Sequence, residues 1–389
     1  MNTNSDHITS RFLEFFDDRG HKPVTGTSLI PPDPDDSVLY VTSGMHPLTS
    51  YLGGRPHPDG NRLCNLQRCL RTTDLDEVGD LTHLTVFGML GSWSLGDYGG
   101  PQSQSWGLEL LTGGYGIPVD RLHVTVFSGD HRCDPDRVSE RQWLELGLRG
   151  EQITGLRDNW WGPNGPDGLC GPDTEMFVWT GPGSPVHDIS RPEWVEVWNH
   201  VLMRYQLTSG GLVKLDRPCV DTGLGLERVV MVLGGHRSVY ETDLLSPWTE
   251  HVQHKYGLTG RSLRLVSDHL RSISLIVGDG VRPSNTGCGY VLRRLIRRTF
   301  RELGDLDGVT PPGWLIEQTG RQLGTEIGSS RVGDVLEDER DRFRKLLVRG
   351  RRELDKLLRR GPVGDMETRF LFETHGIPPE VTRRLLVGG

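Results

Sequence analysis

The stretch CVDTGLGLERVV, residues 219–230, brings an acid, two glycines and an arginine together within eight positions. An extended apolar segment ends at Val220, and residues 224–232 have the apolar spacing of a helix. Taken alone, Asp221 would be the N-cap of that helix, a role that contributes about 1 kcal/mol. The segment therefore predicts a strand-to-helix junction with an acid at the turn.

The same junction also has the features of a binding site. Gly223 and Gly225 would let a ligand approach the backbone closely, and the start of a helix favours negative charge. Arg228 would offer a planar guanidinium to a phosphate or to the face of a nucleobase. Asp221 would offer its carboxylate to a cationic group such as an α-ammonium.

The overall composition is that of a soluble globular protein. The chain has 389 residues, of which 35% are hydrophobic and 25% charged, and a net charge of −8. No apolar run reaches the length of a bilayer span, and the N-terminus lacks the pattern of a signal peptide, so we expect a cytoplasmic protein. The six cysteines form no CxxC pair and no zinc spacing, and we expect them to be reduced.

The first part of the chain, residues 1–240, predicts an α+β domain built on a largely antiparallel sheet. A helical pattern covers residues 8–19, and short strands alternate with connections rich in Gly and Pro. The predicted strands are 38–42, 123–127, 174–179 and 195–203.

The second part, residues 241–389, has helical periods throughout. Within residues 332–360, apolar or small residues recur every seven positions, which predicts an amphipathic helix docked on its own domain; a coiled-coil partner helix is the alternative. Residues 261–304 contain nine arginines against three acids. A basic helix face of this kind suits an RNA backbone, although it is also typical of a plain solvated surface.

A second cluster of polar residues lies upstream. Arg71 and His83 flank an acidic loop, and Phe87 follows shortly after. Such a hairpin is either a surface loop with paired charges or a site where two cations meet a polyphosphate beside an aromatic ring. No lysine is followed by Ser or Thr, so a Walker motif is excluded and arginines would have to hold a nucleotide. In DNWW, one of Trp160 and Trp161 is expected to pack inside and the other to line a pocket.

These pieces resemble, in their order, the class II aminoacyl-tRNA synthetases, and within them the alanyl-tRNA synthetase family. The motifs that carry the resemblance include FFDDRGH, QRCLR, MLGSWSLGDY, NWWGP, CGPDTEMF, VDTGLGLER, SDHLRS, GYVLRRLIRR and ETHGIPPE, and they extend over nearly the whole chain. The resemblance implies an antiparallel sheet flanked by helices as the catalytic domain, residues 1–240. It implies an all-helical tRNA-recognition domain for residues 241–389.

The resemblance also implies a nucleotide site and an amino-acid site. ATP, with Mg²⁺, would be bound with the α-phosphate on Arg71, the outer phosphates on His83, and the adenine between Phe87 and Arg228, with Met89 in the same site. L-Alanine would be bound through its ammonium group on Asp221. The residues expected around it are Trp161, Asn199, Val201 and Gly223.

For tRNA, the resemblance implies that Asn285 and Glu373 read the acceptor-stem G·U pair. The arginines expected on the RNA are Arg293, Arg294, Arg297 and Arg298. The chain departs from the family pattern at Gly88, Ser92 and Glu373, where Glu, Asn and Asp are usual. We expect a form without the editing and C-terminal domains. A paralogue that passes alanine to a small-molecule acceptor, and a non-catalytic tRNA-binding regulator, are the alternatives.

Overall fold

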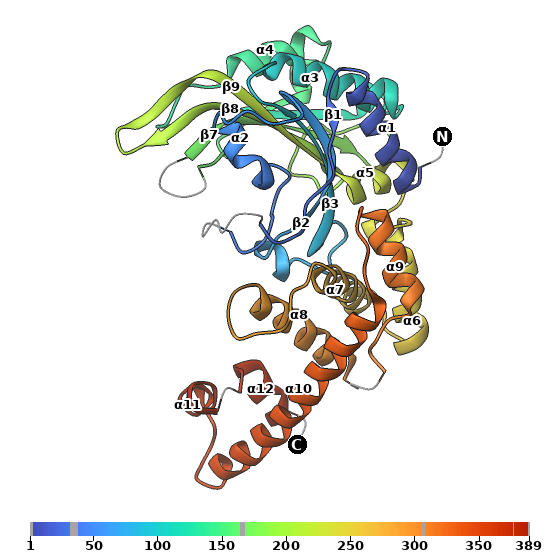
Figure 1. The fold of residues 1–389 in the computed structure, drawn as a ribbon, viewed down its shortest axis with the longest axis vertical. Helices are drawn as coiled ribbons and strands as arrows, with labels where there is room; N and C mark the ends of the chain where they lie inside the picture. The colour runs from blue at the N-terminus through green and yellow to red at the C-terminus, as the bar shows by residue number, and fades with distance from the viewer. Residues whose placement is uncertain (1–2, 32–37, 164–167, 305–307, 376, 388–389) are drawn as a thin grey trace.

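The computed structural model describes residues 3–31, 38–163, 168–304, 308–375 and 377–387, and within them it contains a nine-stranded sheet flanked by helices, followed by helices alone (Figure 1). The order along the sheet is β1-β2-β3-β9-β8-β7-β4-β5, and β6 pairs with β7. The strands are β1 (Lys22–Pro23), β2 (Arg62–Leu70), β3 (Val86–Ser94), β4 (Leu122–Phe127), β5 (Ile153–Leu156), β6 (Trp160–Trp161), β7 (Gly168–Trp179), β8 (Trp194–Thr208) and β9 (Gly211–Gly225). All pairs are antiparallel except β1–β2 and β4–β5, which confirms the predicted sheet type.

One face of the sheet is covered by helices. Helix α1 (Ser5–Asp17) buries Phe12 and Phe16, and the ring of Phe12 lies 5.8 Å from that of Trp198 on β8. Helices α3 (Gly100–Glu109) and α5 (Leu226–Leu233) pack on the same strand. Because successive side chains of a strand point to opposite faces, Asn199 beside Trp198 points to the other face, where a cavity lies.

Three of the four predicted strands are confirmed, since residues 123–127, 174–179 and 195–203 lie in β4, β7 and β8. The prediction for residues 38–42 is wrong. Val41 makes a single bond on each side, from its N–H to the carbonyl of Leu29 (2.9 Å) and from the N–H of Leu70 to its own carbonyl (2.8 Å). The backbone N–H groups of residues 42 and 43 then donate to the side chain of His46, which begins a turn and ends any ladder.

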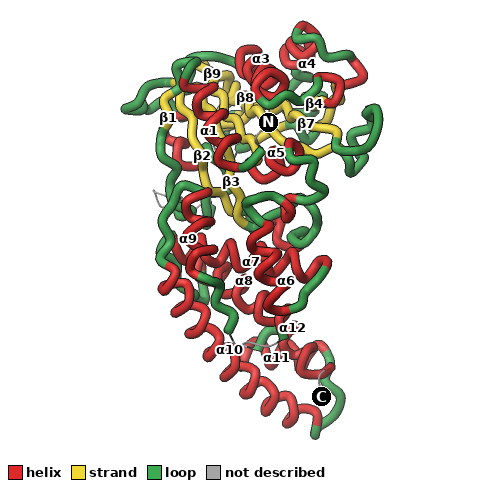
Figure 2. Tube along the Cα trace, turned by 90° about the vertical axis from the view of Figure 1, so that its right-hand side faces the viewer, coloured by secondary structure: helices red, strands yellow, loops and turns green. Residues whose placement is uncertain are grey.

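Helices follow the sheet and form the lower half of the molecule (Figure 2). They are α6 (Ser246–Tyr256), α7 (Gly260–Gly278), α8 (Gly287–Leu303), α9 (Gly313–Gln322), α10 (Ser329–Leu358), α11 (Asp365–His375) and α12 (Pro379–Val387). The long helix α10 packs on α7, α8 and α9 with its first half and on α11 and α12 with its second half. Its predicted apolar face, with Leu336, Phe343 and Gly350 buried, is therefore docked within this chain. In the described part of the chain, no helix has both the length and the apolar character needed to cross a membrane.

Candidate active site

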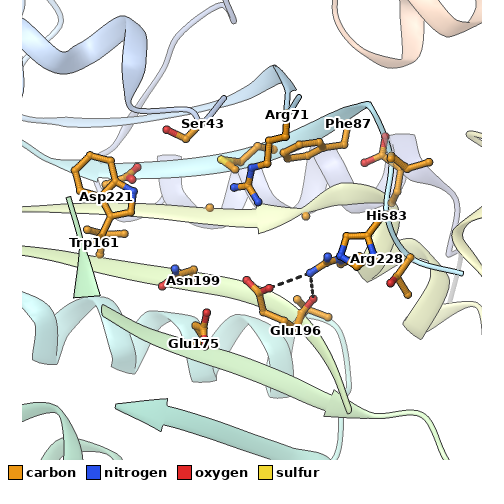
Figure 3. A pocket seen from close by; sticks show the side chains of 18 residues that line it. Ser43, Arg71, His83, Phe87, Trp161, Glu175, Glu196, Asn199, Asp221 and Arg228 are labelled. Atoms are coloured by element: carbon orange, nitrogen blue, oxygen red, sulfur yellow. Dashed lines mark hydrogen bonds and ion pairs between the residues drawn. The ribbon is translucent and has the colours of Figure 1, made fainter. Parts of the chain in front are cut away.

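A cavity of about 230 Å³ lies on the face of the sheet opposite α1 (Figure 3). Strands β3, β9, β8 and β7 provide its floor, and the connection between β2 and β3 provides one wall. The ten residues expected to bind ATP or alanine all line it: Arg71, His83, Phe87, Met89, Trp161, Asn199, Val201, Asp221, Gly223 and Arg228. The structure thus brings together side chains that are up to 157 positions apart in sequence.

The register of the sheet explains why the floor residues meet. Asp221 on β9 lies opposite Trp93 on β3 and opposite Val201 on β8. Two residues further along β9, Gly223 lies opposite Asn199. Directly paired residues point to the same face, so these side chains surround one space.

Asp221 is held inside β9 rather than at a helix start. The strand continues to Gly225, which is the N-cap residue of α5, so the N-cap interpretation of Asp221 is wrong. The carboxylate is 5% exposed, and the indole N–H of Trp93 donates to its Oδ1 at 2.6 Å. Burial raises the pKa of Asp221 to about 7, and the Trp93 hydrogen bond opposes this rise. A carboxyl group in such surroundings gains charge stabilisation from a cation that enters the cavity.

The position of Trp93 depends on two glycines. A Cβ added at Gly91 would lie 2.2 Å from the Trp93 ring, and one added at Gly44 would lie 2.7 Å from it. Trp93 itself is fully buried. Trp93 was not among the site residues predicted from the sequence. The available signal was its position two residues after Gly91, because a glycine leaves space for a neighbouring ring on the same face of the strand.

The opposite end of the cavity carries positive charge. Arg71 follows β2, and its guanidinium carbon lies 5.1 Å from the centroid of the Phe87 ring. Arg228 lies in the first turn of α5 and donates to the Glu196 carboxylate (3.0 Å) and carbonyl (3.2 Å). Figure 3 shows Arg71, Phe87, His83 and Arg228 around the same space, away from Asp221. The cavity is therefore polarised, with a buried acid at one end and guanidinium groups at the other.

His83 lies at this positive end and closes the loop between β2 and β3. It contacts Asp80 (2.5 Å) and Glu77 (3.2 Å), and the Asp80 hydrogen bond raises its pKa. Burial would raise the pKa of Asp80, but the bonds from His83 and from the backbone of residues 82 and 83 lower it to about 2. Glu77 and Asp80 are thus paired, as the surface-loop interpretation expects, and the same histidine lines the cavity. Binding of a polyphosphate at this loop stays a prediction.

Sequence reasoning also missed three acids that line the cavity, which are Glu175, Glu196 and Glu227. Glu175 on β7 accepts a hydrogen bond from Thr125 at 2.9 Å, and burial together with the charge of Glu196 raises its pKa. Nearby, Asp173 accepts from Asn199 at 2.8 Å, and burial followed by the charge of Glu175 raises its pKa to about 7. Glu175 is paired directly with Asn199 and therefore shares its face. Strict alternation in VEVWN would place Glu196 and Asn199 on opposite faces, and the register shift between β7 and β8 at this point, which brings Glu196 to the cavity, cannot be predicted from the sequence.

The fit of the cavity to Mg²⁺ can be judged from its acids. Among the described residues, no group of three His, Cys, Asp or Glu side chains is arranged to hold a metal ion by itself. Glu175 and Glu196 nevertheless both face the cavity. Mg²⁺ is commonly held by one or two carboxylates together with waters and the phosphates of a substrate, so these residues fit an ion that enters with a nucleotide.

The two adjacent tryptophans divide as predicted. Trp161 lines the cavity. Trp160 packs against Phe127, with ring centroids 5.2 Å apart, and stacks on Tyr205 at 5.9 Å. The short strand β6, which pairs with β7, sets this division because it turns the two side chains in opposite directions.

The family departures at Gly88 and Ser92 lie on the side of β3 that faces away from the cavity. A Cβ at Gly88 would meet Leu66, Leu226 and Leu323 at 3.1–3.2 Å. The hydroxyl of Ser92 lies 2.8 Å from that of Thr222, and both are buried. Neither residue therefore lines the space in which a nucleotide would be bound.

The predicted basic face of α8 is only partly free. Arg293 and Arg297 form ion pairs with Glu339 of α10, at 3.2 and 2.7 Å, and Glu339 is 1% exposed. Arg298 donates to the carbonyl of Leu75 at 2.7 Å. These three arginines are therefore half-buried and bonded within the chain, whereas Arg294 is exposed. Binding of RNA by the four arginines stays a prediction.

The two residues predicted to read the G·U pair lie on separate elements. Asn285 precedes α8, is exposed, and accepts a hydrogen bond from Arg293. Glu373 lies on α11, is exposed, and pairs with Arg369 at 2.8 Å. Both side chains are accessible to a partner.

Comparison with known proteins identifies the family to which this chain belongs. A family model described as tRNA synthetases class II (A) matches residues 7–387. The chain therefore belongs to this family of class II tRNA synthetases. A solved histidyl-tRNA synthetase from S. aureus aligns with 64% of this chain and 76% of its own at 12% identity, with a TM-score of 0.37, which is too low to support an argument.

The similar curated proteins are alanine–tRNA ligases. The chain is 42% identical to that of Treponema pallidum (strain Nichols), over 98% of this chain and 68% of the relative. It is 45% identical to that of Treponema denticola over 77% of this chain and 53% of the relative. It is 40% identical to that of Rubrobacter xylanophilus over 98% of this chain and 47% of the relative. The chain thus spans about half to two thirds of the length of these relatives.

Proposed function

We propose that this chain activates L-alanine with ATP, giving alanyl-adenylate and pyrophosphate, and transfers the alanyl group to the 3′ end of tRNA. The observation that carries the proposal is the polarised cavity. The cavity has a volume of about 230 Å³, with the buried carboxylate of Asp221 at one end. Its other end carries the cationic side chains of Arg71, His83 and Arg228. The printed names of the relatives, alanine–tRNA ligases, support the same reaction.

At the acidic end, Asp221 binds the α-ammonium of alanine. The small side chain of alanine is enclosed by Val201, Gly223, Asn199 and Trp161. The space between these residues has room for a methyl group. The N–H of Trp93 holds the carboxylate toward this space.

At the cationic end, Arg71 binds the α-phosphate and His83 the outer phosphates. The ring of Phe87 and the guanidinium of Arg228 bind the adenine, with Met89 beside them. Arg228 is paired with Glu196 in the structure, and that pair must adjust when adenine enters. A planar guanidinium can stack on the base and keep a donor directed at the carboxylate, so a small side-chain rotation is sufficient.

The chemical step is an in-line attack of the alanine carboxylate on the α-phosphate. The carboxylate is already ionised at neutral pH, so the step needs no protein base. It depends on holding two anionic groups close together and on neutralising the charge that develops on the phosphate. Arg71 does both, because it binds the phosphate at the reacting centre.

ATP enters with Mg²⁺, which Glu175 and Glu196 would hold and which would neutralise phosphate charge. The raised pKa of Glu175 falls when a cation binds beside it, because the cation favours the ionised form. The two acids would hold the ion together with the phosphates of the nucleotide.

We assign residues 1–240 to the activation of alanine and residues 241–389 to tRNA recognition. In the second part, Asn285 and Glu373 would contact the acceptor stem, and Arg294 would contact its backbone. Arg293 and Arg297 contribute through their positive potential, since their guanidinium groups are already bonded. We expect this enzyme in the cytoplasm. A small-molecule acceptor and a non-catalytic regulator receive no support from the relatives, which are named as tRNA ligases.

The proposal is tested by alanine-dependent exchange of label between pyrophosphate and ATP, followed by transfer of labelled alanine to tRNA. We expect exchange with alanine that Asp221→Asn reduces at least about 100-fold, because a buried charged pair is lost. Asp216→Asn is the matched control, because Asp216 is exposed on the same strand. Exchange that does not depend on alanine, or that survives in Asp221→Asn, would refute the proposal.

A further inference from the structure

Several arginines of the basic segment 261–304 point inward, to the loop between β2 and β3. Arg261 donates to the carbonyl of Asp76 at 2.9 Å, and Arg264 donates to that of Gly79 at 2.7 Å. Arg298 of α8 donates to a third carbonyl of the same loop, that of residue 75, at 2.7 Å. The helices that follow the sheet thus hold three carbonyls along one side of this loop.

The loop is shaped to receive these side chains. Gly79 has a φ of +101°, and a Cβ there would lie 2.9 Å from Cγ of Arg261. A side chain at position 79 would therefore be both strained and in contact with the arginine. The carbonyls that accept these bonds belong to residues 75, 76 and 79, so the three bonds lie along one short stretch of the loop.

A second set of contacts from α7 holds the strand that follows the loop. Asp268 accepts from the N–H and hydroxyl of Thr85 at 2.8 and 2.5 Å. Arg271, fully buried, donates to the carbonyl of Val86 at 2.7 Å and pairs with Glu227 at 2.6 Å. Helix α7 therefore fixes β3 just before its cavity residue at position 87.

Between these two anchor regions lies His83. The loop places it in the cavity with its neighbours at positions 82 and 84. It bonds to Asp80, within the loop, and its carbonyl accepts from Tyr240 at 3.3 Å. Its side chain has no contact with α7 or α8 among the hydrogen bonds and ion pairs of the described residues. The arginines act on it only through the loop.

We propose that Arg261, Arg264 and Arg298 are positioning residues that hold the loop 71–85, and with it His83, at the end of the cavity where the outer phosphates of a nucleoside triphosphate bind. The proposal rests on the proposed function for the identity of the ligand. It assigns these arginines to the ATP site and not to RNA, although they belong to the same basic segment as the exposed Arg294. Docking of α7 and α8 on the loop is then a condition for binding pyrophosphate.

The test is Arg264→Met, which removes the donor and keeps the aliphatic stem. KM for ATP, for pyrophosphate and for alanine are measured separately in the exchange reaction. We expect the KM values for ATP and pyrophosphate to rise about tenfold, as expected for the loss of one charge-assisted hydrogen bond, and that for alanine to stay within about twofold. Arg264→Lys, which keeps a donor, should recover part of the loss.

Arg282→Ala is the matched control, because Arg282 belongs to the same basic segment and is exposed. It should leave the three KM values unchanged. If Arg264→Met does not fold, Arg261→Met replaces it, since the Arg261 residue is exposed and bonds the same loop. A change that affects alanine as strongly as ATP, or no change for ATP and pyrophosphate, would overturn the positioning role.

Direct binding of ATP and of pyrophosphate by calorimetry separates this proposal from the proposed function. A wild-type chain that binds both ligands but does not exchange label with alanine contradicts the proposed function alone. In that case a weaker affinity for both ligands in Arg264→Met supports the positioning role, and equal affinities overturn it. A wild-type chain that binds neither ligand overturns both proposals.

Discussion

Replacing Trp93 by Phe removes a single N–H from the Asp221 carboxylate and keeps most of the ring. That N–H donates at 2.6 Å and is the side-chain hydrogen bond that opposes the effect of burial on Asp221. Hydrogen bonds to charged groups contribute about 1.5–3 kcal/mol. At about 1.4 kcal/mol for each factor of ten, Trp93→Phe should weaken alanine binding by about 10- to 150-fold.

The same substitution should change the pH dependence. Asp221 must be ionised to bind the ammonium group, and its pKa of about 7 lies far above the ordinary value for an aspartate. kcat/KM for alanine should therefore fall as the pH is lowered through about 7, because the carboxyl group takes up a proton. Loss of the Trp93 hydrogen bond raises the pKa further, so the acidic limb of the profile should move to higher pH in Trp93→Phe.

The assay is alanine-dependent ATP–pyrophosphate exchange, with KM for alanine and for ATP measured from below to above neutral pH. Trp248→Phe is the control, because Trp248 is also fully buried and its N–H donates to Thr319 at 2.8 Å, away from the cavity. It should lower stability without changing KM for alanine. An acidic limb at the same pH in Trp93→Phe and wild type would refute the role assigned to this hydrogen bond.

Two further substitutions follow from the packing of the site and of α8. Gly223→Ala places a Cβ 2.8 Å from the sulfur of Met89, which lines the cavity, so the Met89 side chain must shift. We expect alanine-dependent exchange to fall about fivefold, corresponding to about 1 kcal/mol of overpacking, with a thermal melt as the check on folding. Replacing Arg293 and Arg297 together by Ala leaves Glu339 buried without its partners, and should lower the free energy of unfolding by about 3–5 kcal/mol in a urea titration. Wild-type stability in the double variant would contradict the stabilising role of these two ion pairs.

Sequence reasoning succeeded where local pattern and register agree. The cavity residues on β9 and β8 alternate with core residues, so the pattern VEVWNHV is sufficient to place Asn199 and Val201 on one face of a strand. The position of Asp221 was harder to predict. The glycines at 223 and 225 suggest the end of a strand, yet the backbone stays extended to Gly225, because β3 and β8 both continue to pair with it.

The partners of the arginines could not be predicted from the sequence. Nine arginines in residues 261–304 predict a basic face, but the acceptors are a carboxylate on α10 and carbonyls of a loop about 200 positions earlier. Carbonyl acceptors leave no mark on the sequence, because every residue has one. The prediction of a strand at residues 38–42 was wrong for a related reason. A strand requires a continuous ladder of hydrogen-bond partners, and Val41 makes one such bond on each side.

The length of α10 gives it the properties of a lever arm. Its 30 residues span about 45 Å at about 1.5 Å per residue. The first half is clamped between α7, α8 and α9, whereas the second half carries α11 and α12 with it. The second half alone is about 22 Å long, so a tilt of about 5° at the end of the clamped half would move the far tip by roughly 2 Å. A small change in packing around Phe343, which lies midway along α10, would therefore move α11 and α12 together.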